Sequence, residues 1–282
     1  MIDSFNIGHY FYADDSQLVT HVSLTAVSEH HRRLELCVEH LKDWCSSQRL
    51  QLNQDKTELI WIGSKSKLAD LKQLETNLNI CSVVVQPTDS VHVLGFILDS
   101  KLSMRQHVGK LSSICFFHLR RLREFRYMLD PLSRQRLVSA FILSRIDFCN
   151  TVLVGLLAPL QCVLNAAAWF VAGLPAHAHI TDNIWSLHWL PVAYQIRYKL
   201  CLVMYAIYND TSPSYIADTT TRISMISGFG RRRSANTSEF DIPRTRTKFG
   251  EREIALWQDH ENGMLCWSRS ETSPKYLHSS EA

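Results

Sequence analysis

Two adjacent carboxylates near the start of the chain, Asp14 and Asp15, carry the most distinctive chemistry in the sequence. They lie in the stretch FYADDSQLV, between two short apolar runs. Carboxylates this close repel each other, and a divalent cation such as Mg²⁺, which prefers hard oxygen ligands, offsets that repulsion. Pairs of such ions clamp the attacking and leaving oxygens in phosphoryl transfer. The alternative interpretation is an ordinary solvated turn, in which Asp is common.

The elements around these aspartates are predicted to be two strands and a long helix. Residues 5–12 and 16–20 are rich in aromatic and β-branched side chains, which favours strands on both sides of the turn. The helix that follows should end near SQRLQLNQDK, where Asn53 and Asp55 supply turn chemistry. Its apolar face is predicted from the helical spacing of Leu24, Val27, Leu34, Val38, Leu41 and Cys45, flanked by Cys37 and Trp44.

The rest of the chain is predicted to change from strands to helices. Strands are expected in TELIWIG, in CSVVVQP and in VHVLGFILD, with a polar helix or loop over residues 64–79. Helical periodicity then covers residues 107–129, 132–149, 160–172 and 195–210. The first of these helices should bury one face, formed by Leu111, Cys115, His118, Leu122, Phe125 and Leu129. Beyond about residue 216 the periodicity is lost, and Arg231–Arg233 form a weak basic motif.

Positive charge is concentrated in the helical part. The whole chain carries a net charge of +3, whereas residues 101–150 contain ten basic and three acidic residues, and ten minus three gives +7. Arginines together with aromatic side chains suit a phosphate backbone and exposed bases, and a solvated helix face is the alternative. The predicted cluster lies opposite the apolar face of the helix at 107–129 and consists of Arg120, Arg121, Arg123, Phe116 and Phe117.

The composition indicates an intracellular protein in the nucleus or cytoplasm, neither secreted nor membrane-spanning. No signal peptide opens the chain, and no apolar run approaches the roughly 20 residues of a membrane span. The eight cysteines are scattered without a CxxC pair. This spacing disfavours a structural zinc and predicts reduced, mostly buried thiols.

The order of the motifs resembles the reverse transcriptases of non-LTR, LINE-type retrotransposons. YADD between apolar strands is similar to their catalytic turn, and LKDWCSSQRLQLNQDKTELIWIG is similar to the helix, the LN-DKTE motif and the strand that follow it. VHVLGFILDSKLSMRQHV resembles the next hairpin of that family. SRIDFCN, SLHWLPV and TKFGER match its helical region and tail, so the resemblance runs in order from residue 10 to about residue 253.

The resemblance implies a role for each matching residue. Asp14 and Asp15 would be ligands of Mg²⁺ or Mn²⁺, and Tyr12 would pack near the primer end. Lys56 would help pyrophosphate to leave, as a general acid or a charge stabiliser. The primer-grip turn would be formed by Leu94, Gly95 and Phe96. The arginine-bearing helix would belong to the thumb, which holds an RNA template with its DNA primer.

Complete enzymes of this family carry fingers and half of the palm before the YADD turn, including a further metal-binding aspartate and the nucleotide pocket. Only eleven residues precede Tyr12 here. We therefore expect an α+β fragment: half a palm with short antiparallel strands and a packed helix over residues 1–100, a helical thumb-like region over 101–215, and a degenerate, partly disordered basic tail over 216–282.

Three functional hypotheses follow from this expectation. The fragment could be a complementable polymerase, a residual nucleic-acid-binding module, or a translated transposon remnant without function. Acting alone, it is expected to hold the metal weakly and to be inactive as a polymerase, because a two-metal mechanism needs its whole constellation of ligands. An uncovered sheet edge also predicts self-association.

Overall fold

The structure is a computed structural model that describes residues 2–74, 76–80, 83–153, 155–175, 178–218 and 220. The fold mixes helices with short strands, as the sequence predicts. The chain divides into two compact units, residues 1–107 and 108–282. Most of the predicted tail, including Arg231–Arg233, lies outside the described residues. In the part that the structure describes, no helix has the length and apolar character needed to cross a membrane.

Short strand pairs dominate the first unit. Its described residues form four separate two-stranded sheets. Three pairs are antiparallel hairpins, and the fourth is a parallel pair. The hairpins are β1 Gly8–Tyr12 with β2 Asp15–Val19, β4 Leu78–Ile80 with β5 Val83–Val85, and β7 Ser90–Val93 with β8 Phe96–Asp99, and the parallel pair is β3 Leu59–Ile60 with β6 Pro87–Thr88.

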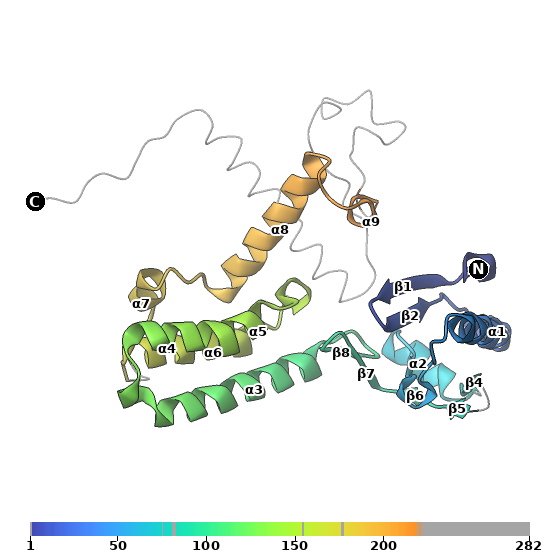
Figure 1. Ribbon diagram of the computed structural model, residues 1–282, viewed down its shortest axis with the longest axis horizontal. Coiled ribbons are helices and arrows are strands. Elements are labelled where there is room, and N and C mark those ends of the chain that lie inside the picture. Colours follow the sequence, from blue (N-terminus) through green and yellow to red (C-terminus); the bar gives the residue numbers. More distant parts are fainter. Residues whose placement is uncertain are drawn as a thin grey trace, which may run out of the picture. The chain divides into compact units, whose positions relative to one another are not determined.

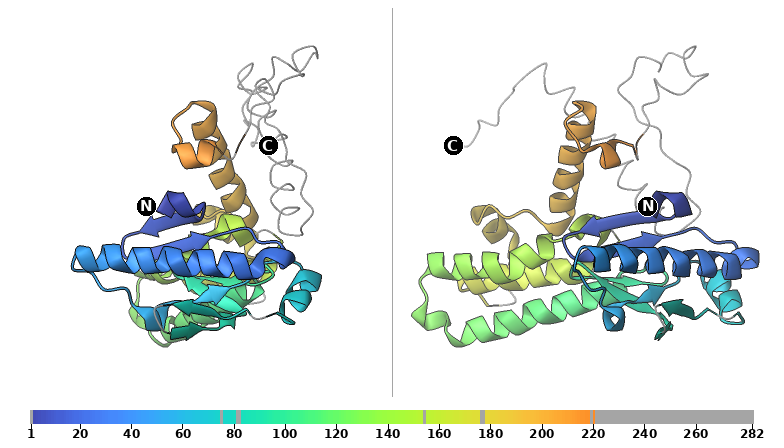
Figure 2. Two further views of the ribbon diagram at one scale, coloured as in Figure 1. Left: turned by 90° about the vertical axis from the view of Figure 1, so that its right-hand side faces the viewer. Right: turned by 45° about the vertical axis from the view of Figure 1, so that its right-hand side comes forward.

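Helix α1, Val27–Ser47, carries the core of the first unit. It lies between the β1–β2 hairpin and the β4–β5 hairpin (Figure 2). Leu18 and Leu34 pack against both of the buried clusters, so they join the two sides. One cluster contains Ile2, Ile7, Cys37 and Leu41, and the other contains Val38, Leu78, Ile80 and Val85. A carboxylate oxygen of Glu35 also accepts a hydrogen bond from the Asn79 amide at 2.8 Å.

Several predictions for the first unit need correction. The long helix ends at Ser47, the first residue of the stretch in which its end was predicted, but Cys37 is fully buried although it was expected only to flank the apolar face. Only Leu59–Ile60 of TELIWIG pair as a strand, because the partner β6 has two residues. The polar stretch 64–79 contains the short helix α2, Lys65–Leu71, and then the start of the unpredicted strand β4.

The residue types of VHVLGFILD predicted one strand, whereas the family resemblance implied a hairpin with its turn at Leu94–Phe96; the structure forms a hairpin. Val93 lies opposite Phe96, so the turn has two central residues, Leu94 and Gly95. Their φ angles are 49° and 83°. A two-residue turn with positive φ at both positions matches the right-handed twist of its strands. Leucine rarely adopts this conformation, which is why the residue types alone did not reveal the turn.

Helices form the second unit, and the boundary between the units falls within α3, Arg105–Glu124. Asp130 begins the next helix, because its side chain accepts hydrogen bonds from the amides of Leu132 and Ser133 at 3.1 and 3.2 Å. The predicted single helix at 132–149 is interrupted by a π-helical turn at Ser139–Leu143, which lies between the helices labelled α4 and α5 in Figure 1. The elements after α3 are α4 Pro131–Val138, the π-helix Ser139–Leu143, α5 Ser144–Asp147, α6 Leu157–Ala172, α7 Thr181–Ser186, α8 Val192–Tyr208 and α9 Ser214–Ala217.

Helix α6 is the centre of this unit, since it is buried over most of its surface. It contacts α4, α7 and α8. Two arginines close its carboxyl end: Arg126 donates to the Gly173 carbonyl at 2.6 Å, and Arg134 donates to the Phe170 carbonyl at 3.5 Å. Positive charge at this end of a helix is favourable, because the unpaired carbonyls there carry partial negative charge.

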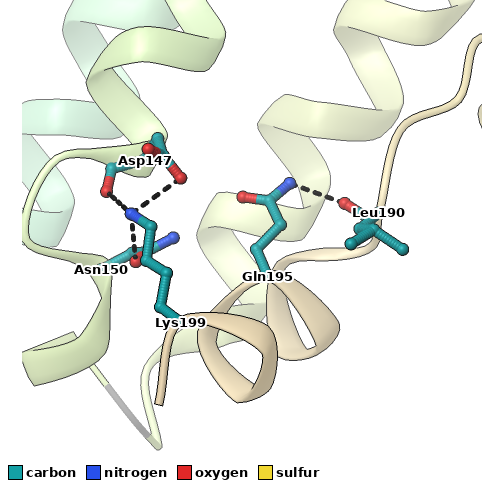
Figure 3. A network of polar contacts seen from close by, with 5 residues as sticks. All are labelled: Asp147, Asn150, Leu190, Gln195 and Lys199. Atoms are coloured by element: carbon teal, nitrogen blue, oxygen red, sulfur yellow. Dashed lines mark hydrogen bonds and ion pairs between the residues drawn. The ribbon is translucent and has the colours of Figure 1, made fainter. Parts of the chain in front are cut away.

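Lys199 on α8 joins that helix to the segment that follows α5 (Figure 3). Its ammonium group lies 2.8 Å from a carboxylate oxygen of Asp147 and 2.6 Å from the Asp147 carbonyl. It also donates to the side-chain oxygen of Asn150 at 3.2 Å, and Asn150 is fully buried. Nearby, Gln195 donates to the Leu190 carbonyl at 2.6 Å, at the start of α8. These contacts give the buried side-chain oxygen of Asn150 a hydrogen-bond donor, and they hold α8 next to the end of α5.

The buried face of α3 differs in part from the prediction. Leu111 and Cys115 are buried as expected. Phe125, however, is 50% exposed, because α3 ends at Glu124 and a short 3-10 turn follows. Leu119, which the predicted face did not include, is fully buried in its place. Of the six described cysteines, Cys149, Cys162 and Cys201 are exposed, so the expectation of mostly buried thiols was wrong for half of them.

Candidate nucleic-acid interface

The β1–β2 turn presents Asp14 and Asp15 to solvent. Tyr12 lies opposite Asp15 in the strand register, so Ala13 and Asp14 form the two-residue turn. The φ angle of Ala13 is 53°, a left-handed conformation that an L-residue with a Cβ adopts at a cost of about 1–2 kcal/mol. The structure thus brings Tyr12, Asp14 and Asp15 together at one strained tip.

Both faces of this hairpin are uncovered near the turn. Side chains alternate between the two faces of a strand, so Tyr10 and Tyr12 lie on one face and Phe11 lies on the other. All three rings are exposed. Within the described residues, β1 and β2 pair only with each other, and their outer edges carry no further strand. The acidic tip therefore stands clear of the core of the first unit.

The donor set at this tip fits a divalent cation only in part. Adjacent carboxylates are hard oxygen ligands of the kind that Mg²⁺ and Mn²⁺ accept. A catalytic pair of ions needs further donors around it. No group of three or more His, Cys, Asp or Glu side chains among the described residues could hold a metal ion. Asp14 and Asp15 therefore supply only part of the ligand set that a two-metal nucleotidyl transfer needs.

Lys56 lies at the end of a 3-10 turn, Gln54–Lys56, just before β3. Its side chain is exposed. No hydrogen bond or ion pair in the described part of the chain joins it to Asp14 or Asp15. The role that the family resemblance implies for Lys56 stays a prediction.

The β7–β8 turn has an open tip and a buried base. Apart from Gly95 and its two chain neighbours, no residue has an atom within 4 Å of the position that a Cβ on Gly95 would occupy, so another molecule has room to approach the backbone there. Leu94 beside it is exposed. Phe96 is buried instead, with its ring centroid 4.0 Å from that of His107. Phe96 therefore anchors the hairpin, and the exposed tip consists of Leu94 and Gly95.

Asp99 fixes the other end of this hairpin. Its carboxylate accepts a hydrogen bond from the Met104 amide at 2.9 Å. Burial acts to raise the pKa of Asp99, but hydrogen bonds from Ser103 and Met104 outweigh it and hold the pKa below its ordinary value. The charged carboxylate thus connects β8 to the start of α3.

The arginines of α3 form a positively charged surface in the described part of the second unit. Arg120, Arg121 and Arg123 are all exposed. Residues 108–126 hold five basic residues and one acidic residue, which gives a net charge of +4. In the region that the structure describes, none of these three arginines takes part in an ion pair. Their guanidinium groups are therefore available to an anionic partner.

Aromatic rings adjoin this charged surface. The guanidinium carbon of Arg121 lies 6.0 Å from the centroid of the Phe117 ring, which is a cation–π distance. Phe117 is 49% exposed, whereas Phe116, which was expected on the same side, is half-buried. No sequence pattern indicated the contact between His118 and Phe141, because the two residues belong to different helical segments. Their rings stack with centroids 5.4 Å apart.

The candidate residues thus fall into two separate sets. The aspartates, Lys56 and the Leu94–Gly95 tip belong to the first unit, and the arginines belong to the second. No protein-family model matches the chain, and no curated protein or solved structure gives a match.

Proposed function

We propose that this chain is a nucleic-acid-binding polypeptide of the non-LTR reverse transcriptase type, and that α3 grips an RNA template paired with a DNA primer. The ordered resemblance of its motifs supports the family. One structural observation carries the binding function: Arg120, Arg121 and Arg123 are exposed together on α3 and free of ion pairs in the described region.

The physical argument rests on phosphate charge. A duplex carries a dense row of phosphates with condensed counterions, and each guanidinium that neutralises a phosphate releases such ions. Arginine suits this task because its planar fork donates two parallel hydrogen bonds to phosphate oxygens. The contact needs no metal and no particular base sequence.

The hairpin tips have a secondary role in this proposal. By family resemblance, Gly95 would lie against the primer backbone, and the open space over its α-carbon supports a close approach. Asp14 and Asp15 would lie near the primer end with Tyr12. Two carboxylates without a bound cation repel phosphate, so they add nothing to the affinity of the chain for a duplex.

Fluorescence anisotropy with a labelled RNA/DNA template–primer tests the proposal on the full chain. We expect the triple variant Arg120→Ala/Arg121→Ala/Arg123→Ala to weaken binding by about 100-fold, at roughly 1 kcal/mol for each lost phosphate contact. The double variant Asp14→Asn/Asp15→Asn should bind as well as the native chain or slightly better, because it removes two like charges.

A matched control separates a specific grip from net charge. Lys65, Lys67 and Lys72 are exposed around α2, and replacing all three with Ala removes the same charge from the first unit. This control should lose far less affinity than the arginine variant. Equal losses in the two triple variants, or no saturable binding by the native chain, would contradict the proposal.

A further inference from the structure

A continuous run of cationic and aromatic side chains crosses the surface of the second unit. Arg121 lies over the Phe117 ring, and Phe117 meets the His118 ring edge-on with centroids 5.6 Å apart. His118 in turn stacks on Phe141, with an angle of 22° between the two ring planes. The run therefore joins α3 to the π-helical turn, and we call these four residues the aromatic run.

Both phenyl rings of the aromatic run keep a large part of their surface open. Phe117 is 49% exposed and Phe141 is 42% exposed. The His118 ring contacts both phenyl rings, so the open parts of Phe117 and Phe141 belong to one connected aromatic surface of the kind that binding partners use. The π-helical turn at Ser139–Leu143 contains Phe141. Single π-helical turns are frequent at functional sites, since the added residue redirects the side chains of that turn.

The charge around the aromatic run identifies the kind of partner. Lys110 lies seven residues before Phe117 and Arg121 lies four residues after it, so the three share one face of α3. Residues 108–126 carry +4 in total. A partner must therefore combine negative charge with flat apolar faces. Nucleic acid has both, because its phosphates are anionic and each base offers a π-face.

We propose that the aromatic run binds unpaired nucleotides, with bases stacked on Phe117 and Phe141 and phosphates held by Arg121 and Lys110. This inference rests on the proposed function and makes it more specific. In a duplex the faces of the bases are already stacked on one another, and only their edges are accessible in the grooves. The rings can therefore contact only a single strand, such as template that is not yet paired.

Binding to a short oligonucleotide and to its abasic analogue tests this inference on the full chain. Both probes are single-stranded DNA of about 12 nucleotides with the same number of phosphates, and they differ only in the bases available for stacking. We expect the native chain to bind the base-bearing probe about tenfold or more tightly than the abasic one. The variant Phe117→Ala/Phe141→Ala should bind both probes equally.

Two further variants keep the outcome interpretable. Phe148 is 47% exposed and has no part in the aromatic run, so Phe148→Ala should retain the preference for bases. Phe117→Trp, with its larger ring, should retain or increase it. A native chain without a preference for bases, or a preference that survives in the double Ala variant, would overturn the inference. Duplex binding in the same experiment reports on the proposed function separately, because loss of the preference leaves the phosphate contacts in place.

Discussion

The two units hold their candidate functional side chains on different kinds of backbone. In the first unit these side chains lie at the tips of two-residue turns, where Ala13 and Leu94 have φ angles of 53° and 49°. In the second unit they project from α3, whose opposite face is held by the fully buried Leu119. Strained backbone persists where the surrounding structure fixes it, and it often marks a site that needs exact geometry. Exposed arginines on a helix need no strained backbone, because regular helical geometry is enough to present their side chains.

The two units also differ in the chemistry considered for them, which is metal-dependent phosphoryl transfer in the first and phosphate binding in the second. Metal-dependent phosphoryl transfer fails when part of its ligand set is missing, because its groups act as a unit. Phosphate contacts contribute one by one, so a part of the surface still binds. The binding that we propose for the second unit therefore does not require a complete set of metal ligands.

The largest effect on stability should come from truncating a buried side chain of α3, the helix that carries Arg120, Arg121 and Arg123. Leu119→Ala deletes a fully buried side chain, and we expect it to lower the free energy of unfolding by about 2–5 kcal/mol. Urea denaturation measures this loss. The matched substitution Leu36→Ala, on the exposed side of α1, should change stability by less than about 0.5 kcal/mol. Similar losses in both variants would show that α3 is not packed as described.

A smaller loss is expected from the polar contacts that hold α8. Lys199→Met removes the donor to the buried side-chain oxygen of Asn150, and an unsatisfied buried acceptor costs about 1–3 kcal/mol. Asp147→Asn should cost less, since that side chain is partly exposed and its backbone carbonyl still accepts from Lys199. Thermal unfolding of the two variants ranks them. A larger effect for Asp147→Asn would show that the Asp147 carboxylate, and not the buried side-chain oxygen of Asn150, is the more important acceptor for Lys199.

Relief of strain in the first unit should give a gain in stability. Leu94→Asn places a residue that tolerates the left-handed region at a φ of 49°, and we expect stabilisation of about 0.5–1 kcal/mol. Leu94→Val puts a β-branched residue at the same position and should destabilise by at least as much. Denaturant midpoints of the two variants provide the measurement. Equal midpoints would mean that the turn relaxes without strain.

The smallest effect should be a pH dependence that is specific to the first unit. Burial lowers the pKa of His31 below its ordinary value of 6.5, and the nearby Glu35 offsets part of the shift. The unfolded chain therefore binds the proton more readily, so this contribution to stability is complete above pH 6.5 and decreases as the pH falls through the folded pKa. Stability measured between about pH 7 and pH 5 should fall less in His31→Phe than in the native chain. An identical pH profile for both would contradict the buried, neutral state of His31.

The long helices could be predicted from the sequence because their periodicity records burial within each helix. This holds for α1, α3, α6 and α8. The short elements β4 and α7 have too few residues to show a period, and they form through packing against neighbours. The turn at Leu94–Gly95 was implied by the family resemblance but not by the residue types, because leucine rarely adopts a positive φ. The π-helical turn depends on the packing around Phe141 and has no local pattern.

In the candidate site, too, local features could be predicted from the sequence and contacts between elements could not. The acidic pair and the arginine cluster are visible in the sequence because charge and spacing are local properties. The burial of Phe96 against His107 and the stacking of His118 on Phe141 are contacts between elements, and no local pattern encodes them. These contacts decide which aromatic rings are available to a partner. Side-chain chemistry was therefore easier to predict than side-chain exposure.

The salt dependence of binding to an RNA/DNA template–primer tests the role of α3 most directly. Affinity of the native chain should fall steeply between about 50 and 200 mM salt, and the triple arginine variant should lose about three units of slope in a plot of log affinity against log salt. The Asp14→Asn/Asp15→Asn variant should keep the native slope. A native slope retained by the arginine variant would show that α3 does not hold the phosphates.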